Sequence, residues 1–269
     1  MRITLHRQGA LGDVICTVPV LRRLRMTYPD AEIQVSGGFA DVFAYNPYTG
    51  GISTDSEQYR VDLDLAYERR PQMHVIDAYM EESFGDTGAG WDKSTWLHRE
   101  HRWKCAPSTV LIHAARSWPN RTFDSGFWDT LAAALIARRF NVTFVGNGMD
   151  YGGPRSLGCD SAVGALSLHQ TAGLIADAAL IVGSDSGLLH VAGTTQTPIV
   201  GLYTCARAAY RIPFRPHVIG IDAKIECAGC LQHAPVPTTS YSCNRGDNEC
   251  IRKISPEEVL QAITTLVQS

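Results

Sequence analysis

The chain has 269 residues, of which 45% are apolar and 19% charged, and its 24 basic and 27 acidic side chains give a net charge of −3. This length can bury a sizeable core in one large or two small domains, and the composition is that of an ordinary globular protein. The nearly balanced charge excludes the broad positive field that nucleic-acid-binding and membrane-surface proteins carry, so we expect neither partner.

The first residues, MRITLHRQGALGDV, contain no apolar core and no small-residue cleavage site, so we expect no signal peptide. The longest strongly apolar stretch, residues 172–183, contains Asp177 and is too short to span a bilayer. We therefore expect a cytoplasmic protein with no transmembrane segment, whose thiols stay reduced.

Strands and helices alternate in the first part of the chain. Gly85 provides a stop signal for one predicted helix. Residues 86–107 have no clear period and are rich in Gly, Trp and charge, which indicates an interdomain segment. The hydrophobic periodicity predicts strands over 2–7, 31–37 and 61–67, and helices over 12–28 and 73–85.

The alternation restarts after this segment. Asp124 is a suitable N-cap for one helix, and Ser255, Pro256 and Glu258 give the last helix a capping box with proline in its first turn. Two successive arrays predict an α/β protein with two Rossmann-like halves, residues 1–105 and 106–269, with parallel sheets facing a cleft. The predicted strands are 109–115, 141–146, 179–184, 198–203 and 217–222, and the predicted helices are 124–139, 167–178, 185–194 and 255–268.

The usual nucleotide-binding signatures are missing. The loop after the first strand reads RQGALGD, which is not GxGxxG, and no GxxxxGK[ST] sequence occurs. A dinucleotide-dependent dehydrogenase or a P-loop enzyme is therefore disfavoured.

Two junctions between a strand and a helix have residues suited to chemistry. In the first, Gly9 and Gly12 permit a tight turn, and Asp13 either stabilises the helix start or accepts a proton from a substrate hydroxyl. In the second, a buried strand runs into Ser186 and Gly187, where free backbone N–H groups would bind an anion. The alternative there is a simple helix cap, with His190 packed on the helix.

Four of the eight cysteines follow one another closely, as Cys227, Cys230, Cys243 and Cys250. A CxxC pair with two further cysteines has metal-ligand spacing, and a segment this poor in apolar residues would gain stability from a metal. The sequence predicts a closed, structural site for zinc or iron. Two disulfides or four free thiols are the alternatives. The other cysteines, Cys16, Cys105, Cys159 and Cys205, are expected to be isolated, small, buried residues.

Four segments in order resemble glycosyltransferase family 9, the heptosyltransferases. GALGDVICTVPVLRRLR resembles the opening of the family, SDSGLLHVAGTTQTPIVGLY its D-[ST]-G-x-x-H-x-A segment, and IHAARSWPNRTFDSGFW the strand and loop between them. CAGC, with the later cysteines and ISPEEV, resembles the cysteine-rich C-terminal segment of many members. Together the segments cover most of the chain.

The resemblance implies an inverting GT-B glycosyltransferase that takes heptose from an ADP-sugar. Asp13 matches the family's proposed general base, in a cleft loop of Gly9, Ala10, Leu11 and Gly12. Arg121 stands where the family usually has lysine, and a guanidinium can also clamp a phosphate. No catalytic Mg²⁺ is required, and the family includes members with an iron site. The implied donor-site residues are Ser117, Gly146, Asn147, Asp185, Ser186, Gly187, Leu188 and His190.

The N-terminal half is short for a GT-B domain, which leaves the acceptor open. A saccharide or a protein hydroxyl fits equally well. The alternatives in function are a non-catalytic nucleotide-sugar-binding module and a GT-B relative that uses another nucleotide sugar. We also expect that the chain can form a homo-oligomer.

Overall fold

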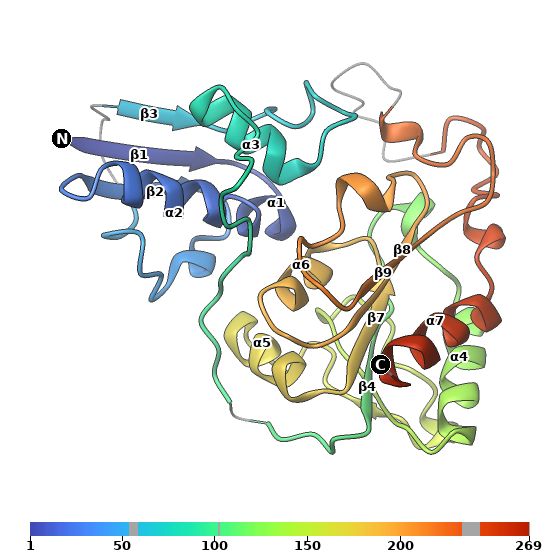
Figure 1. The fold of residues 1–269 in the computed structure, drawn as a ribbon. Helices are drawn as coiled ribbons and strands as arrows, with labels where there is room; N and C mark the ends of the chain where they lie inside the picture. The colour runs from blue at the N-terminus through green and yellow to red at the C-terminus, as the bar shows by residue number, and fades with distance from the viewer. Residues whose placement is uncertain (54–58, 102, 233–242, 269) are drawn as a thin grey trace. The chain divides into compact units, whose positions relative to one another are not determined.

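The structure is a computed structural model that describes residues 1–53, 59–101, 103–232 and 243–268 (Figure 1). Residues 233–242, which belong to the predicted four-cysteine segment, lie outside the described residues. The chain forms two compact units, Met1–His98 and Arg99–Ser269. The expected division after residue 105 falls on the irregular segment that precedes the first strand of the second unit.

The first unit contains a parallel sheet of three strands in the order β2-β1-β3. In the register, Leu5 lies beside Val35 on one side and Val61 on the other. Its elements are β1 (Arg2–Arg7), α1 (Leu11–Ile15), α2 (Val18–Thr27), β2 (Glu32–Gly37), a 3₁₀ helix (Ala40–Phe43), β3 (Tyr59–Asp62) and α3 (Val75–Phe84).

Two elements of this unit differ from the prediction. The helix expected over 12–28 is two helices, interrupted at Cys16 and Thr17, and Pro19 lies in the first turn of α2, where no N–H donor is needed. The strand expected over 61–67 ends at Asp62, because the Asp62 carboxylate accepts a hydrogen bond from the Asp64 N–H at 2.9 Å and turns the chain. The expected glycine stop is present, since Gly85 ends α3 with a φ of 74°.

The second unit contains a parallel sheet of six strands in the order β6-β5-β4-β7-β8-β9. Chain order reverses between the central strands β4 and β7, and the loops after such strands are where ligands bind in open α/β sheets. The strands are β4 (Thr109–His113), β5 (Asn141–Phe144), β6 (Asp160–Ser161), β7 (Leu180–Ser184), β8 (Ile199–Tyr203) and β9 (Val218–Asp222), and the helices are α4 (Ser125–Ala137), α5 (Leu168–Asp177), α6 (Gly187–Gly193) and α7 (Pro256–Gln268).

The caps predicted for the second unit lie where expected. Asp124 accepts a hydrogen bond from the Phe127 N–H at 2.8 Å and begins α4. Ser255 accepts one from the Glu258 N–H at 3.2 Å and begins α7. The Glu258 carboxylate, however, pairs with Lys224 at 2.6 Å.

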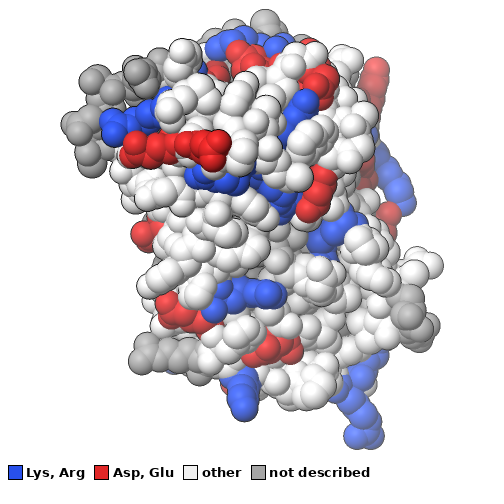
Figure 2. Space-filling model, turned by 60° about the vertical axis from the view of Figure 1, so that its left-hand side comes forward, with Lys and Arg blue, Asp and Glu red and all other residues white. Residues whose placement is uncertain are grey.

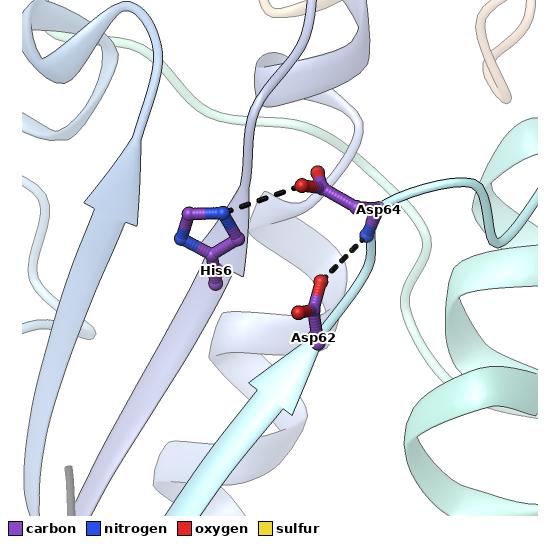
Figure 3. A group of neighbouring side chains, drawn as sticks. All are labelled: His6, Asp62 and Asp64. Carbon is purple, nitrogen blue, oxygen red and sulfur yellow. Dashed lines mark hydrogen bonds and ion pairs between the residues drawn. The ribbon is translucent and has the colours of Figure 1, made fainter.

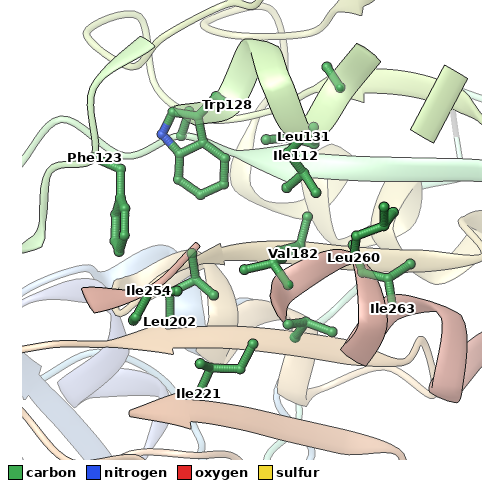
Figure 4. Close-up of a cluster of buried hydrophobic side chains, with 14 of the residues drawn as sticks. Ile112, Phe123, Trp128, Leu131, Val182, Leu202, Ile221, Ile254, Leu260 and Ile263 are labelled. Atoms are coloured by element: carbon green, nitrogen blue, oxygen red, sulfur yellow. The ribbon is translucent and has the colours of Figure 1, made fainter. Parts of the chain in front are cut away.

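The core of the second unit lies between its sheet and the helices α4 and α7 (Figure 4). Trp128 of α4 is 1% exposed and packs edge-on against Phe123, with 5.7 Å between the ring centres. The side chains drawn around it come from the two helices, the strands and the turn before α7, and include Ile112, Leu131, Val182, Leu202, Ile221, Ile254, Leu260 and Ile263.

The surface agrees with the balanced composition. On the face drawn in Figure 2, acidic and basic side chains are interspersed, and much of the surface between the groups is uncharged. None of the described helices combines the length and apolar character needed to cross a bilayer.

Candidate functional site

Asp13 lies in the first turn of α1, directly after β1. Its Oδ2 accepts a hydrogen bond from the Ala10 N–H at 3.0 Å, and its side chain is 23% exposed. Asp13 therefore stabilises the helix start, as one reading of the sequence expected, and its side chain remains partly exposed. The two roles are compatible at one residue.

A buried arginine approaches this carboxylate. Arg7, the last residue of β1, is 4% exposed, and its Nη2 lies 3.5 Å from Asp13 Oδ2 and 2.7 Å from Glu68 Oε1. Its Nη1 donates to the Leu63 carbonyl at 2.9 Å. Burial alone would lower the pKa of Arg7, but Tyr79, Glu68 and Asp13 raise it above its usual value, so the arginine stays charged.

Gly9 lies between the arginine and the aspartate. A Cβ at this position would lie 2.9 Å from Arg7 Nε and 2.9 Å from Asp13 Oδ2. Glycine is needed here because the two charged side chains approach the backbone closely, and no left-handed turn is involved. Gly9 therefore makes room for the protein's own side chains. The other residues of this loop, Ala10, Leu11 and Gly12, form the start of α1.

A histidine and two aspartates lie beside this group (Figure 3). His6 Nε2, near the end of β1, is 3.4 Å from Asp64 Oδ2, and its Nδ1 is 2.8 Å from Ser36 Oγ. His6, Asp62 and Asp64 are the one group in the described part of the chain with three His, Cys, Asp or Glu ligand atoms within 4.8 Å of one another.

Both carboxylates of this group already have partners. Asp62 pairs with Arg60 at 3.0 Å, and Asp64 accepts from the Gln8 N–H at 2.7 Å with Arg7 Nη1 at 3.8 Å. Because the negative charge is balanced by arginines, the arrangement disfavours a cation. These contacts connect the loop before Asp13 to the end of β3.

In the second unit, the loops after β4 and β7 bring Arg121 and Asp185 together. Arg121 Nη1 lies 3.4 Å from Asp185 Oδ2, and its Nε donates to Cys205 Sγ at 3.3 Å. The guanidinium also lies over the Trp118 ring at 4.1 Å. Asp185 is 5% exposed and the Arg121 side chain is 16% exposed, so these contacts hold the arginine in a mostly buried position.

The helix α6 begins next to this pair. Ser186 occupies the N-cap position without a side-chain cap, and its Oγ is buried with no hydrogen-bond partner among the described atoms. The N–H groups of Gly187 and Leu188 belong to the first turn, which has no partners within the helix. His190 lies half-buried in the next turn. Polar groups of these loops thus converge at the carboxyl edge of the sheet.

The loop after β5 is built around Asp150. Its Oδ2 accepts from the Asn147 N–H at 2.9 Å, and its Oδ1 accepts from the Arg116 N–H at 2.9 Å. A Cβ on Gly146 would lie 2.3 Å from Asp150 Oδ2. Both oxygens are therefore engaged inside the protein, and Asp150 shapes the loop without offering an acceptor to a ligand. Ser117, predicted in the donor site, is exposed in the bend after β4.

The cysteines of the C-terminal segment gather near one another, and a fifth joins them. Burial, followed by the nearby thiols of Cys205 and Cys243, raises the pKa of Cys250 to about 11. Cys205 was expected to be isolated, which is wrong, because it also contacts Arg121. Backbone hydrogen bonds join its loop to the CxxC turn, from the Gly229 N–H to the Thr204 carbonyl at 2.8 Å and from the Leu231 N–H to the Cys205 carbonyl at 2.9 Å.

The cysteines of this segment suit a metal ion that binds thiolate ligands. All eight cysteines are free thiols. Burial would raise the pKa of Cys243, but hydrogen bonds from the N–H groups of Asn248, Arg245, Asp247 and Gly246 lower it, as needed for a thiolate ligand. Among the described residues, no three of these sulfurs lie within 4.8 Å of one another, whereas ligands of one tetrahedral metal lie about 3.8 Å apart. Binding would draw them together.

Sequence reasoning missed the partners that surround the candidate base. Glu68, Tyr67 and Tyr79 lie in no motif, and only tertiary structure places them against Arg7. One signal was available in the sequence. Arg7 ends an apolar strand, and a buried arginine needs an acid as its partner.

Two α/β units with parallel sheets, each with charged and small residues at its carboxyl edge, are the architecture of a GT-B glycosyltransferase. Residues 57–237 match glycosyltransferase family 9 (heptosyltransferase), and the chain belongs to this family. It is a glycosyltransferase.

Similar proteins agree with this assignment. Lipopolysaccharide heptosyltransferase 1 of Pseudomonas aeruginosa is 23% identical, and the match covers 99% of this chain and 98% of the relative. The iron-containing dodecameric glycosyltransferase TibC of enterotoxigenic E. coli shares the fold with a TM-score of 0.81 at 16% identity, covering 99% of this chain and 76% of TibC. E. coli ADP-heptose lipopolysaccharide heptosyltransferase II has a TM-score of 0.74 at 16% identity, covering 100% and 99%.

Proposed function

We propose that the protein is an inverting glycosyltransferase that transfers heptose from an ADP-sugar to a hydroxyl of a saccharide or protein acceptor. Family membership supports the reaction class. The observation that carries the proposal is the carboxylate of Asp13, held by the Ala10 N–H and partly exposed at the carboxyl edge of its sheet. The positive charge of Arg7 lies next to it, with Nη2 3.5 Å from Asp13 Oδ2.

In the proposed reaction the acceptor oxygen attacks the anomeric carbon of the sugar. Its proton passes to the Asp13 carboxylate, and the new C–O bond forms as the bond to the diphosphate oxygen breaks. The electron pair of the broken bond leaves with ADP. Attack from the side opposite the leaving group inverts the anomeric centre.

The leaving diphosphate needs positive charge. Arg121 supplies a partly exposed guanidinium, and the first-turn N–H groups of Gly187 and Leu188 supply hydrogen bonds. Asp185 and Cys205 hold the arginine from behind. We assign Ser117, Asn147, Ser186 and His190 to the same donor site. With these groups the reaction requires no catalytic Mg²⁺, and we expect EDTA to leave transfer unchanged.

We further propose that Cys227, Cys230, Cys243 and Cys250 hold one structural iron or zinc ion. Their thiols are free, and their sulfurs influence one another. Bound metal would fix the C-terminal segment to the loop after β8, and it takes no part in the transfer step. Elemental analysis of the purified protein tests this, because Cys227→Ser together with Cys230→Ser should abolish the metal content.

We also propose a cytoplasmic location, where the thiols of the four-cysteine segment would stay reduced. Size-exclusion chromatography with light scattering will show whether the chain forms a homo-oligomer.

The first test of the function is calorimetric titration with ADP, UDP and GDP. Selective ADP binding supports an ADP-sugar donor, whereas selective UDP or GDP binding would overturn the heptose donor and retain the fold. The second test is Asp13→Ala, which should abolish transfer and leave donor binding nearly intact. Normal turnover by this variant would refute the base assignment. A protein that binds donor but neither transfers nor hydrolyses it would be a binding module.

A further inference from the structure

Arg7 is a buried cation near three carboxylates, of which Asp64 is the most distant at 3.8 Å and Glu68 and Asp13 share its Nη2. Glu68 accepts a hydrogen bond from Arg7 Nη2 at 2.7 Å, whereas Asp13 Oδ2 lies 3.5 Å from the same nitrogen. The first distance is that of a strong charge-assisted hydrogen bond, and the second is too long for one. The acid nearer to the arginine is therefore Glu68, which takes no part in the proposed proton transfer.

The rest of the arginine is fixed. Its Nη1 donates to the Leu63 carbonyl at 2.9 Å, and the guanidinium carbon lies 5.1 Å and 5.6 Å from the ring centres of Tyr67 and Tyr79. Arg7 Nε is buried and has no hydrogen-bond partner among the described atoms. The guanidinium thus keeps unused hydrogen-bonding capacity a short distance from Asp13.

We propose that Glu68 is a positioning residue that competes with Asp13 for Arg7 and so keeps Asp13 able to accept a proton. The inference rests on the proposed function, in which Asp13 is the base. Glu68 takes the short hydrogen bond from Arg7 at 2.7 Å, and Asp13 stays at 3.5 Å from the same nitrogen. Asp13 therefore lies beside the cation without a direct hydrogen bond to it.

The competition has a chemical consequence. When Glu68 is present, the acceptor proton moves to an oxygen that has no hydrogen bond from Arg7. Without the charge of Glu68, the positive charge of Arg7 is shared with fewer acids and acts more strongly on Asp13, which then takes up a proton less readily. The barrier to proton transfer rises, whereas donor binding in the other unit is unaffected.

Two variants separate this role from simple structural support. Glu68→Gln keeps the size of the side chain and removes its charge, and Arg7→Met combined with Glu68→Gln also removes the shared cation. Glu82→Gln is the matched control, because Glu82 also accepts an arginine at 2.7 Å, from Arg70, with a side chain that is 25% exposed. Rates are measured as ADP release from ADP-heptose with heptose-free lipopolysaccharide.

We expect Glu68→Gln to lower kcat about tenfold with an unchanged donor KM. The double variant should recover most of this loss, because no arginine remains to hold Asp13. Glu82→Gln should behave as the wild type. If Glu68→Gln keeps full kcat, or if the double variant is no faster than the single one, the competition does not exist.

A second measurement does not depend on turnover. Double-mutant cycles from urea unfolding give the coupling between Arg7 and Asp13, using Arg7→Met and Asp13→Asn, in the wild type and in Glu68→Gln. Competition predicts that this coupling at least doubles when Glu68 is neutral, and an unchanged coupling would overturn the inference.

The Asp13→Asn variant also distinguishes the two proposals. If it transfers normally, the base assignment fails. If it is inactive while Glu68→Gln is fully active, only the present inference fails.

Discussion

Replacing Gly9 by alanine tests the packing around the candidate base. The new Cβ would lie 2.9 Å from both Arg7 Nε and Asp13 Oδ2, and both are side chains that must move away. Ordinary contacts begin near 3.4 Å, so each group shifts by roughly 0.5 Å, and because a 1 Å misplacement costs about 10²-fold in rate, we expect about a tenfold fall in kcat. That corresponds to about 1.4 kcal/mol in the barrier.

The assay is the initial rate of ADP release, with urea unfolding measured on the same samples. Gly9 has no left-handed φ, so alanine at this position reduces the conformational entropy of the unfolded chain and stabilises the folded protein by up to about 1 kcal/mol. This gain offsets part of the strain, and we expect the free energy of unfolding to stay nearly unchanged. Gly50→Ala is the matched control, because its Cβ would make only an ordinary contact of 3.6 Å with the Ile33 carbonyl. A Gly9→Ala enzyme with wild-type kcat would refute the reasoning that Asp13 is held tightly for catalysis.

Three further predictions concern the second unit. Trp128→Ala should destabilise the protein by about 3–5 kcal/mol in urea unfolding, because the indole is 1% exposed in the core, and a loss under about 1 kcal/mol would contradict that packing. Arg121→Ala should weaken ADP binding about tenfold or more by calorimetry, and the affinity of Arg121→Lys should lie between those of the wild type and Arg121→Ala. If Arg121→Ala binds ADP as tightly as the wild type does, Arg121 is not part of the donor site. Burial lowers the pKa of His113 despite a hydrogen bond to the Val145 carbonyl and the charge of Asp150. As the pH falls, the unfolded chain therefore binds this proton at a higher pH than the folded protein does. Stability should therefore fall as the pH drops below about 6.5, by up to about 1.4 kcal/mol per pH unit, and His113→Gln should flatten that slope.

Most of the secondary structure could be predicted from the sequence, because buried parallel strands and capped helices have strong local signals. Asp124 and Ser255 identified the starts of α4 and α7, and Gly85 the end of α3. The end of β3 could not be predicted, since VDLDLAY alternates as a strand would, and only the turn made by Asp62 ends it.

The parts of the candidate site that lie within a single loop could be predicted from the sequence. Asp13, Ser186 and Gly187 lie at strand-to-helix junctions that the sequence marks. The contacts of Arg7 with Glu68, and of Cys205 with Arg121, join residues far apart in the chain. No periodicity or spacing encodes such pairs, because they depend on how strands are ordered in the sheet.

The first sheet has a consequence for how the protein is made. All of its strands come from one continuous stretch, and the unit they belong to ends at His98. No later residue is needed to complete the sheet, so this unit can fold while the second is still being synthesised, at about 5–20 residues per second. The candidate base and its arginine would then be assembled on the nascent chain before Arg121 leaves the ribosome.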